Sequence, residues 1–415
     1  MASIGWIDFS PKDRNRVGSI LDLLRPEGMV DELGLGTIRD SISNQLFPGI
    51  STIQTRAKYF FIIPYILREY QSLPFAQRRT KTASKFLEEK EYEIMWQLAE
   101  KYDYIEGNGV IGISKHKPEK IIRRPSTIYW TGLYTYKFID TRGLSTEDFL
   151  NKVTNFSLES LLSKTQMDSD ENRDDLDAGY EDIFRIKVPL KPKWSEKLNL
   201  DLDKDEAEFF EDRIISISKN KLIAELLTNE RLWQLFISAE NFMDFAKKAA
   251  AKITLPKRNH TTPNLKDIMV LAHDFSELMY GAHIAYNNQL HQKVFNKNYF
   301  EEDWMKWLQN IHTRMLDYQN FDPDKLFALS LNTRETTVKF VKKWWELTKN
   351  NFNDLNERDN QVAFQEAIVK GSKARLKWNK FDDVQEGKWL GLKYFDYRFN
   401  QAKTILKDIK TGLQN

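Results

Sequence analysis

The chain has 415 residues, which is enough for a large core and for two or three domains. Its 62 basic and 60 acidic residues give a net charge of +2, so any surface that attracts nucleic acid must be a local patch. The absence of cysteine excludes disulfides, thiolate zinc sites, iron–sulfur clusters and a cysteine nucleophile. No charged start is followed by an apolar segment and no run reaches the ~18 apolar residues of a membrane span, so we expect a cytoplasmic protein without membrane contact.

The first elements predicted are a short strand and a helix. Residues 4–9 alternate between apolar and other side chains in the manner of a strand. Ser10 then stands at a helix N-cap, with Pro11 at the first helical position. The apolar spacing that follows predicts a helix that ends at Arg25 and Pro26.

Residues 34–67 predict two helices joined by a turn. A Pro-Gly pair at 48–49 ends the first helix. Ser51 and Gln54 after it have the spacing of a capping box, which predicts that the second helix begins there. Pro64 lies inside the apolar pattern of that second helix and predicts a kink or an early stop.

The second of these helices carries polar side chains on its predicted outer face, namely Gln54, Arg56 and Lys58. Two helices around a tight turn, with cations in the second helix, suit a helix-turn-helix that sets these side chains against nucleic acid. The alternative is a helical hairpin with a solvated basic face, which is a common arrangement.

Further basic residues lie between positions 77 and 124. Arg78 and Arg79 belong to a loop that leads into a helix predicted for residues 82–102. The glycines and short β-branched runs of residues 105–125 then predict a hairpin with a cationic rim. A helix followed by such a hairpin is typical of a winged helix, whose wing would contact phosphates, and a solvated surface hairpin is the alternative. The basic residues of the rim are Lys115, Lys117, Lys120, Arg123 and Arg124, with His116 among them.

Composition divides the chain near its middle. Residues 166–182 hold eight carboxylates, one arginine and few apolar residues, which predicts an acidic linker or loop. Metal binding by these carboxylates is the alternative, but the glycine turn and distal glutamate of a calcium loop are missing. We therefore expect an N-terminal helical domain over residues 1–165, winged-helix-like in one interpretation, and a C-terminal helical domain over residues 183–415.

The C-terminal domain is predicted to be almost wholly helical. Asp203 and Glu206 form a capping pair ahead of one helix. The longest helix spans about residues 265–294, and Gly281 within it allows close contact with another helix. The predicted fold class is therefore mainly α and multi-helical, with small β elements.

A basic and aromatic run lies at residues 370–381. The mixture suits backbone contact and base stacking on single-stranded nucleic acid. It equally suits a surface loop whose aromatic residues fill the core. The cations are Lys370, Lys373, Arg375, Lys377 and Lys380, interleaved with Leu376, Trp378 and Phe381.

Signatures of catalysis are missing from the sequence. His273 and Glu277 lie one helical turn apart, but the metalloprotease pattern of two histidines around a glutamate is not present. There is no Walker loop, nucleophile elbow or kinase signature. The sequence therefore predicts no catalytic residues, no metal site and no cofactor, and favours a protein that is not an enzyme. A nuclease site assembled from scattered acids and lysines stays open as an alternative.

Several segments along the chain carry a family resemblance. They read SIGWIDFSPKDR, LGLGTIRDSISNQLFPGISTIQTRAKYFFIIPYIL, HDFSELMYGAHIAYN, KGSKARLKW and YRFNQAKTILKDIKTGL. Together they resemble a bacterial protein family catalogued only as a domain of unknown function. The resemblance implies a component of antiphage defence loci, of the Azaca type, with a helicase and a phospholipase-D-like nuclease as partners. It implies no catalytic residues.

These observations predict a non-catalytic nucleic-acid-binding or scaffold subunit, which binds the phosphate backbone of DNA or RNA through local basic patches. The alternatives are a metal-dependent nuclease whose carboxylate site is not visible in the sequence, and a protein–protein adaptor. The predicted nucleic-acid contacts are Gln54, Arg56, Lys58, Arg78, Arg79, Lys115, Lys117, Arg123, Arg124, Lys370, Lys373, Arg375 and Lys377.

Overall fold

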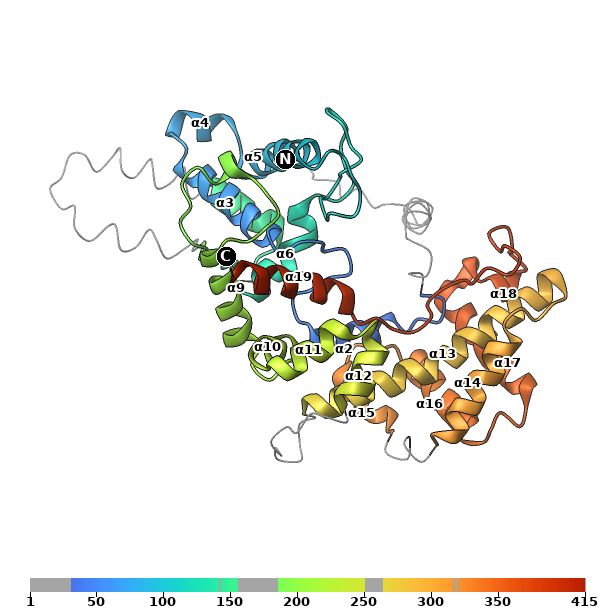
Figure 1. Cartoon of the computed structure of the whole chain (residues 1–415). Helices are drawn as coiled ribbons and strands as arrows, with labels where there is room; N and C mark the ends of the chain where they lie inside the picture. The colour runs from blue at the N-terminus through green and yellow to red at the C-terminus, as the bar shows by residue number, and fades with distance from the viewer. Residues whose placement is uncertain are drawn as a thin grey trace, which may run out of the picture. The chain divides into compact units, whose positions relative to one another are not determined.

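The computed structural model describes residues 31–141, 143–155, 186–250, 264–315, 318 and 321–414. The strand and helix predicted for residues 4–26 and the acidic segment 166–182 lie outside these residues. The described part is mainly helical, as predicted (Figure 1). Its β structure is limited to an isolated antiparallel bridge between Ile139 and Ile186. No helix of the described part combines the length and the apolar character that crossing a membrane requires.

Residues 105–124 form a series of turns and not the predicted hairpin. Gly107, Gly109 and Gly112 have φ angles of 92°, 88° and 76°, which bend the backbone at short intervals and leave no extended run to pair. Thr55 Oγ1 donates a hydrogen bond to the Gly109 carbonyl oxygen at 2.7 Å and helps to hold the turns in place. The wing of a winged helix would need the paired strands that these residues do not form.

The chain divides into two compact units, and each is assembled from separate stretches of sequence. Unit 1 comprises Met1–Ile42 and Lys266–Tyr397, and unit 2 comprises Ser43–Leu265 and Arg398–Asn415. The sequence predicted a division at residues 166–182. Because that segment lies outside the described residues, the linker stays a prediction.

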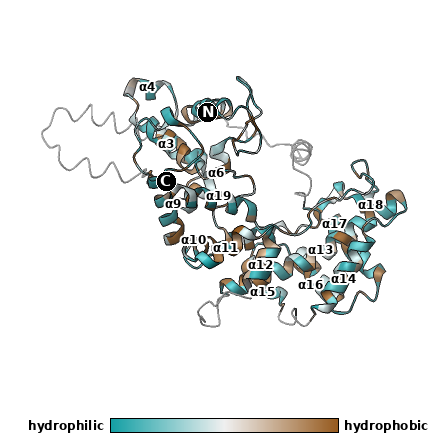
Figure 2. Ribbon diagram, in the orientation of Figure 1, coloured by the Kyte–Doolittle hydropathy of each residue, from teal (hydrophilic) through white to brown (hydrophobic). Residues whose placement is uncertain are grey.

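Unit 2 is organised around α3, in which residues 59–67 are all buried. This helix is apolar nearly all round, so other helices can cover it on several sides. Helices α5 and α6 pack against α3, and α9 packs against α10 and α19. Most helices contain both hydrophilic and hydrophobic residues (Figure 2). Helices of unit 2 include α3 (Tyr59–Ser72), α4 (Phe75–Thr80), α5 (Ala83–Lys101), α6 (Pro125–Thr135), α9 (Lys204–Ile217), α10 (Leu222–Thr228), α11 (Glu230–Ser238), α12 (Phe242–Ala250) and α19 (Phe399–Gly412).

An aromatic cluster fills the core between these helices. The ring of Phe60 on α3 lies 4.7 Å from that of Phe210 and 5.6 Å from that of Phe138, measured between centroids. Helix α6 comes close to this cluster because Gly132 has no side chain. A Cβ atom at Gly132 would lie 2.5 Å from the Phe60 ring and 2.6 Å from the carbonyl oxygen of Gly49.

Helix α3 begins at Tyr59, and the start predicted at Ser51 is wrong. Ser51 and Gln54 hold a turn instead, because Ser51 N donates to Gln54 Oε1 at 3.1 Å and Gln54 Nε2 donates to the Gly49 carbonyl oxygen at 3.1 Å. The helix also continues past Pro64, so the early stop predicted there does not occur. Burial of the whole segment outweighs the local signals for a helix start and a helix stop.

Unit 1 is organised around the long helix α13, in which residues 271–291 are nearly all buried. A Cβ atom at Gly281 would lie 2.3 Å from the ring of Trp307 on α14, so the close helix contact predicted at this glycine is confirmed. Trp307 Nε1 also donates to the Glu277 carbonyl oxygen at 2.8 Å. The helices are α13 (Leu265–Phe295), α14 (Glu301–Thr313), α15 (Pro323–Leu329), α16 (Glu335–Lys349), α17 (Leu355–Lys370) and α18 (Arg375–Trp378), and α2 (Gly36–Leu46) begins in this unit and ends in unit 2.

We expect the buried imidazole of His283 on α13 to make the stability of unit 1 sensitive to acid. Its side chain is fully buried, and neither ring nitrogen has a hydrogen-bond partner. Burial lowers the pKa of His283 from 6.5 to about 4, against the attraction of Asp31. The unfolded state therefore binds a proton below about pH 6.5 that the folded state does not bind until about pH 4. The free energy of unfolding is therefore highest above about pH 6.5, and it decreases as the pH falls from there to about pH 4.

Between about pH 7.5 and about pH 5, the free energy of unfolding should fall by about 2 kcal/mol because of His283. Urea unfolding at the two pH values measures this change. In His283→Leu this part of the acid sensitivity should disappear, whereas His312→Leu, which alters an exposed histidine, should keep it. The prediction would be contradicted if the free energy of unfolding fell by the same amount between the two pH values in His283→Leu and in the unaltered protein.

Candidate functional site

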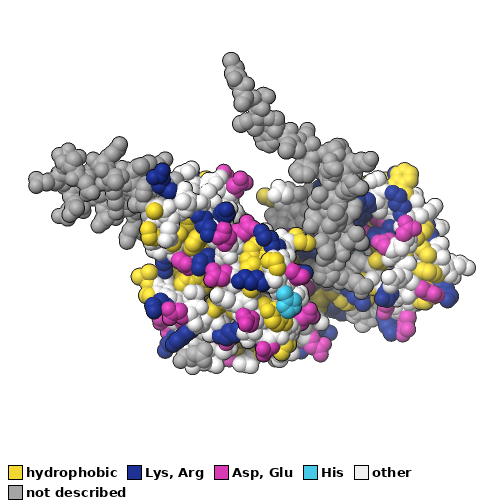
Figure 3. Space-filling model, turned by 90° about the horizontal axis from the view of Figure 1, so that it is seen from above, with side chains coloured by type: hydrophobic (Ala, Val, Ile, Leu, Met, Phe, Trp, Pro, Cys, Tyr) yellow, Lys and Arg dark blue, Asp and Glu magenta, His cyan; other side chains and the backbone are white. Residues whose placement is uncertain are grey.

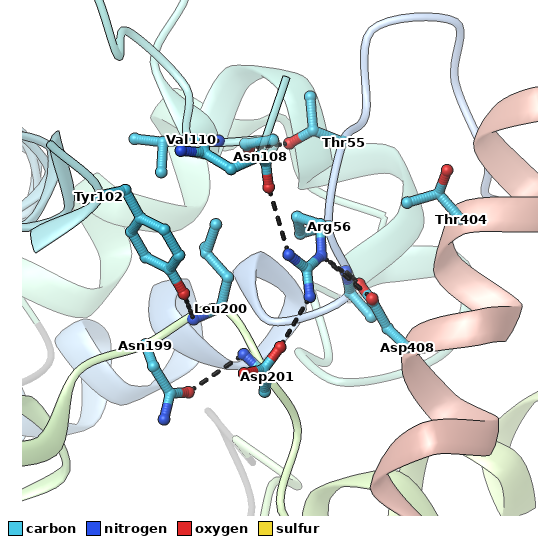
Figure 4. A network of polar contacts seen from close by, with 12 residues as sticks. Thr55, Arg56, Tyr102, Asn108, Val110, Asn199, Leu200, Asp201, Thr404 and Asp408 are labelled. Atoms are coloured by element: carbon cyan, nitrogen blue, oxygen red, sulfur yellow. Dashed lines mark hydrogen bonds and ion pairs between the residues drawn. The ribbon is translucent and has the colours of Figure 1, made fainter. Parts of the chain in front are cut away.

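Arg56, a predicted phosphate contact, lies at the centre of a polar network inside unit 2 (Figure 4). Its Nε donates to Asp408 Oδ2 at 2.9 Å, Nη2 to Asp201 Oδ1 at 2.9 Å and Nη1 to the Asn108 carbonyl oxygen at 3.2 Å. Asp408 also accepts from Ala57 N at 2.8 Å. Burial alone would lower the pKa of Arg56, but the bonds and charges of Asp408 and Asp201 raise it. The guanidinium therefore holds the chain before α3 to α19.

Lys58 also points inward. Its Nζ lies 2.6 Å from Glu206 Oε2, and these side chains are 8% and 0% exposed. Tyr65 OH donates to the same carboxylate at 3.0 Å, and Lys191 Nζ lies 3.7 Å from it. A buried ion pair is stable only with such additional donors. The capping pair that the sequence predicts at Asp203 and Glu206 is confirmed, so this carboxylate also caps α9.

Gln54, Arg56 and Lys58 therefore do not form the outward-facing row that the sequence predicts. Gln54 and Lys58 are only 4% and 7% exposed. The physical reason is twofold: these residues precede α3 and so do not share a helical face, and acids from α9 and α19 draw the two cations inward.

Three other predicted contacts of unit 2 lie near the ends of helices. Arg78 Nε donates to the Leu73 carbonyl oxygen at 2.7 Å, which closes the turn around α4. Arg124 Nη1 donates to Glu91 Oε2 at 3.1 Å, and that glutamate is 2% exposed. Arg79 is exposed in the last turn of α4. Arg78 and Arg124 thus have structural roles at these helix ends.

The predicted rim at residues 115–123 remains on the surface of unit 2. Lys115 Nζ lies 3.6 Å from Glu119 Oε2, and Lys117 Nζ lies 5.3 Å from the centroid of the Trp96 ring. Arg123 is exposed. The rim therefore offers cations, but acids partly neutralise two of them, since Lys120 Nζ also lies 3.2 Å from Glu88 Oε1.

The basic and aromatic run of unit 1 is fixed by a buried acid, and we call residues 370–380 the Trp378 segment. The segment begins at Lys370, the last residue of α17, and contains a 3-10 turn (Gly371–Lys373) and α18. Glu366 on α17 is fully buried and accepts from Arg375 N at 2.7 Å and Leu376 N at 3.0 Å. These N–H groups begin α18 and have no partner within it, so the carboxylate determines where the short helix starts.

Two predicted contacts in this segment pair with acids. Lys370 Nζ and Arg375 Nη1 lie 3.1 Å and 3.0 Å from Glu32 Oε2, and Glu32 is 1% exposed. Arg375 Nε also donates to Asp383 Oδ1 at 3.0 Å. Burial alone would lower the pKa of Arg375, but the bond to Asp383 and the surrounding negative charges raise it. Lys370 and Arg375 therefore anchor the segment to unit 1.

The other cations of the Trp378 segment, Lys373, Lys377 and Lys380, are exposed. Lys377 Nζ lies 4.8 Å from the centroid of the Trp378 ring, and Lys380 Nζ donates to the Ser372 carbonyl oxygen at 2.6 Å. The segment contains no Asp or Glu. It therefore presents three exposed cations on a backbone that buried groups hold in place.

Basic and acidic side chains are interspersed over the face seen in Figure 3. Exposed lysines of unit 1 often have a glutamate one helical turn away, as in Lys306 with Glu302 at 2.5 Å and Lys339 with Glu335 at 2.7 Å. Such pairs reduce the local potential. Among the described residues, no group of three or more His, Asp or Glu is arranged to hold a metal ion.

Sequence analysis missed the acids that build this site, namely Glu32, Glu366 and Asp383. Each is an ordinary glutamate or aspartate in its local sequence, and Glu32 lies more than 300 positions from the residues that it binds. No pattern within a short window marks such a residue, because its partner is brought near only by the fold.

The structure defines a helical protein of two units, in which an exposed basic segment stands on buried acids. A family described as "Family of unknown function (DUF6361)" matches residues 1–407, and the chain belongs to this family. That membership agrees with the resemblance to a domain of unknown function noted from the sequence. No curated protein and no solved structure matches the chain.

Proposed function

We propose that the chain is a nucleic-acid-binding subunit, and that the Trp378 segment contacts the phosphate backbone. The observation that carries this proposal is the set of three exposed cations, Lys373, Lys377 and Lys380, within a segment that has no acid of its own. The net charge of the chain is only +2, so attraction of a polyanion depends on local sets of cations such as this one. Phosphate groups are the common polyanionic partner of clustered lysines.

The fixed backbone of the segment supports the same proposal. Glu32 and Glu366 are buried and hold Lys370, Arg375 and the start of α18, so the neighbouring lysines project from an ordered support. An ordered support lowers the conformational entropy that binding must overcome. Contacts by the exposed residues Arg79, Lys117 and Arg123 and by the half-buried Lys115 would take the place of a wing, and they stay predictions.

The double variant Lys377→Glu/Lys380→Glu tests the proposal. With three phosphate contacts, nucleic-acid affinity of the unaltered protein should fall about 20- to 40-fold between about 50 mM and about 200 mM salt. The double variant should bind more weakly, and its dependence of log affinity on log salt should be shallower by about 2. Filter binding of DNA and RNA at the two salt concentrations measures both quantities.

The matched control is Lys306→Glu/Lys339→Glu, which makes the same change in charge elsewhere on unit 1 at exposed lysines. This control should retain the affinity and the salt dependence of the unaltered protein to within a small factor. Absent or salt-independent retention of DNA and RNA by the unaltered protein would contradict the proposal, as would equal losses in the two double variants.

The resemblance in sequence gives this activity a setting, which we propose as an antiphage defence locus of the Azaca type. The chain would supply recognition of nucleic acid, and the helicase and the phospholipase-D-like nuclease of the locus would supply unwinding and cutting. In a bacterial strain that carries the locus, Lys377→Glu/Lys380→Glu should then lose protection against phage in a plaque assay. Full protection by this variant would show that defence does not depend on Lys377 and Lys380 of the Trp378 segment.

A further inference from the structure

Trp378 distinguishes its segment from an ordinary basic patch. Among the tryptophans of the described residues it is the one that is exposed, with 52% of its surface accessible. Leu376, two positions earlier, is buried and supplies the apolar contact of the segment with the core. The sequence left open whether the aromatic residue fills the core or stays outside, and the structure places Trp378 outside.

The exposed ring is nevertheless fixed. Trp378 Nε1 donates to the Gly371 carbonyl oxygen at 3.0 Å, which ties one edge of the indole to the 3-10 turn. Gly371 has φ 55° and ψ −119°, a conformation that only glycine adopts easily. Asn379 follows in the left-handed conformation and ends α18 directly after the tryptophan. The position of the ring therefore comes from backbone geometry and one hydrogen bond, and does not require burial.

A fixed and exposed indole suits a flat apolar partner. Ordering a side chain costs conformational entropy on binding, and here the native contacts have already ordered it. Lys377 Nζ lies 4.8 Å from the ring centroid, and with Lys380 it places positive charge within reach of a phosphate next to a stacked group. Flatness and negative charge occur together, at short and regular intervals, in a nucleotide chain.

We propose that Trp378 stacks on an unpaired base of single-stranded nucleic acid, while Lys377 and Lys380 contact the adjacent phosphates. This inference rests on the proposed function and makes it more specific. In a duplex the faces of the bases are covered by their neighbours, so an indole has no base face to contact. In a single strand each base offers a face, and stacking of this kind depends little on sequence.

The experiment compares three oligonucleotides of equal length by fluorescence anisotropy: an oligothymidine, a duplex, and a single strand of abasic sites with the same phosphates. The unaltered protein should bind the oligothymidine about 5- to 150-fold more tightly than the abasic strand, which is the range that one stacked base provides. Trp378→Leu should lose that advantage and bind both strands alike, and Trp378→Phe should retain part of it. The salt dependence should be the same in all three proteins, since the lysines are unchanged.

Tyr134→Ala is the control for loss of an exposed aromatic residue, because Tyr134 on α6 is 51% exposed. It should bind all three oligonucleotides as the unaltered protein does, and thermal unfolding should confirm that each variant is folded. The stacking inference would be overturned if binding depended on salt but Trp378→Leu bound the oligothymidine as tightly as the unaltered protein does. It would also be overturned if the unaltered protein bound the abasic strand as tightly as the oligothymidine. Either result would leave the phosphate contact standing. Absence of binding to every oligonucleotide would instead overturn the proposed function itself.

Discussion

Replacement of Lys58 by methionine should lower the free energy of unfolding of unit 2 by about 3–5 kcal/mol, towards the lower end. The substitution leaves Glu206 fully buried without the ammonium that lies 2.6 Å away. Lys191 Nζ, 3.7 Å from the same carboxylate and 36% exposed in its side chain, offsets part of this loss. Urea unfolding at neutral pH measures the change. The prediction concerns stability because the structure gives Lys58 a buried partner.

The control is Lys120→Met, which removes an exposed ion pair with Glu88 in the same unit. That change should cost about 1 kcal/mol or less, since water screens the pair. In Lys58→Met/Glu206→Gln, the buried charge is removed together with its partner, so part of the lost stability should return. If Lys58→Met were as stable as the unaltered protein and bound nucleic acid more weakly, the interpretation as a phosphate contact would be restored and the structural one would fail.

Replacement of Gly132 by alanine should destabilise unit 2 by about 3 kcal/mol. The new methyl group would meet the ring of Phe60 at 2.5 Å and the carbonyl oxygen of Gly49 at 2.6 Å. A side chain can rotate away, but the oxygen belongs to the backbone of a turn and can move only if the turn shifts. The gain in helix propensity on replacing glycine, up to about 1 kcal/mol, is too small to compensate.

The neighbouring substitution Thr131→Ala serves as the reference for Gly132→Ala. Thr131 is exposed on the same helix, so alanine there changes helix propensity without a steric conflict. The free energy of unfolding of Thr131→Ala should match or slightly exceed that of the unaltered protein. Urea unfolding of Thr131→Ala, Gly132→Ala and the unaltered protein measures these differences. A Gly132→Ala variant as stable as Thr131→Ala would show that the turn at Gly49 yields, and that the contact between α3 and α6 is loose.

Elements fixed by local chemistry were the predictable part of the fold. The capping pair at Asp203 and Glu206, and the helix predicted for residues 82–102 and found at Ala83–Lys101, depend on residues a few positions apart. Gly281 could be assigned because a glycine inside a long apolar helix has few other uses. These predictions needed no information from distant parts of the chain.

The candidate site was less predictable because charges act through space. Arg56 and Lys58 look like surface cations until α19 brings Asp408 and α9 brings Glu206 against them. Lys377 and Lys380, by contrast, keep the exposure that a solvated basic run implies. Nothing in the local sequence separates the two pairs, since each consists of cations next to aromatic residues. The difference lies in which cations meet an acid from a remote part of the chain.

The bond between Arg56 and Asp408 has a consequence for synthesis of the protein. Unit 2 takes its first helices from early in the chain and its last helix, α19, from residues made after all of Lys266–Tyr397. A ribosome delivers the chain from the N-terminus, so α3 emerges long before the carboxylate that its neighbour Arg56 binds. Unit 2 therefore cannot reach its final structure until residues 399–412 have been synthesised and have left the ribosome.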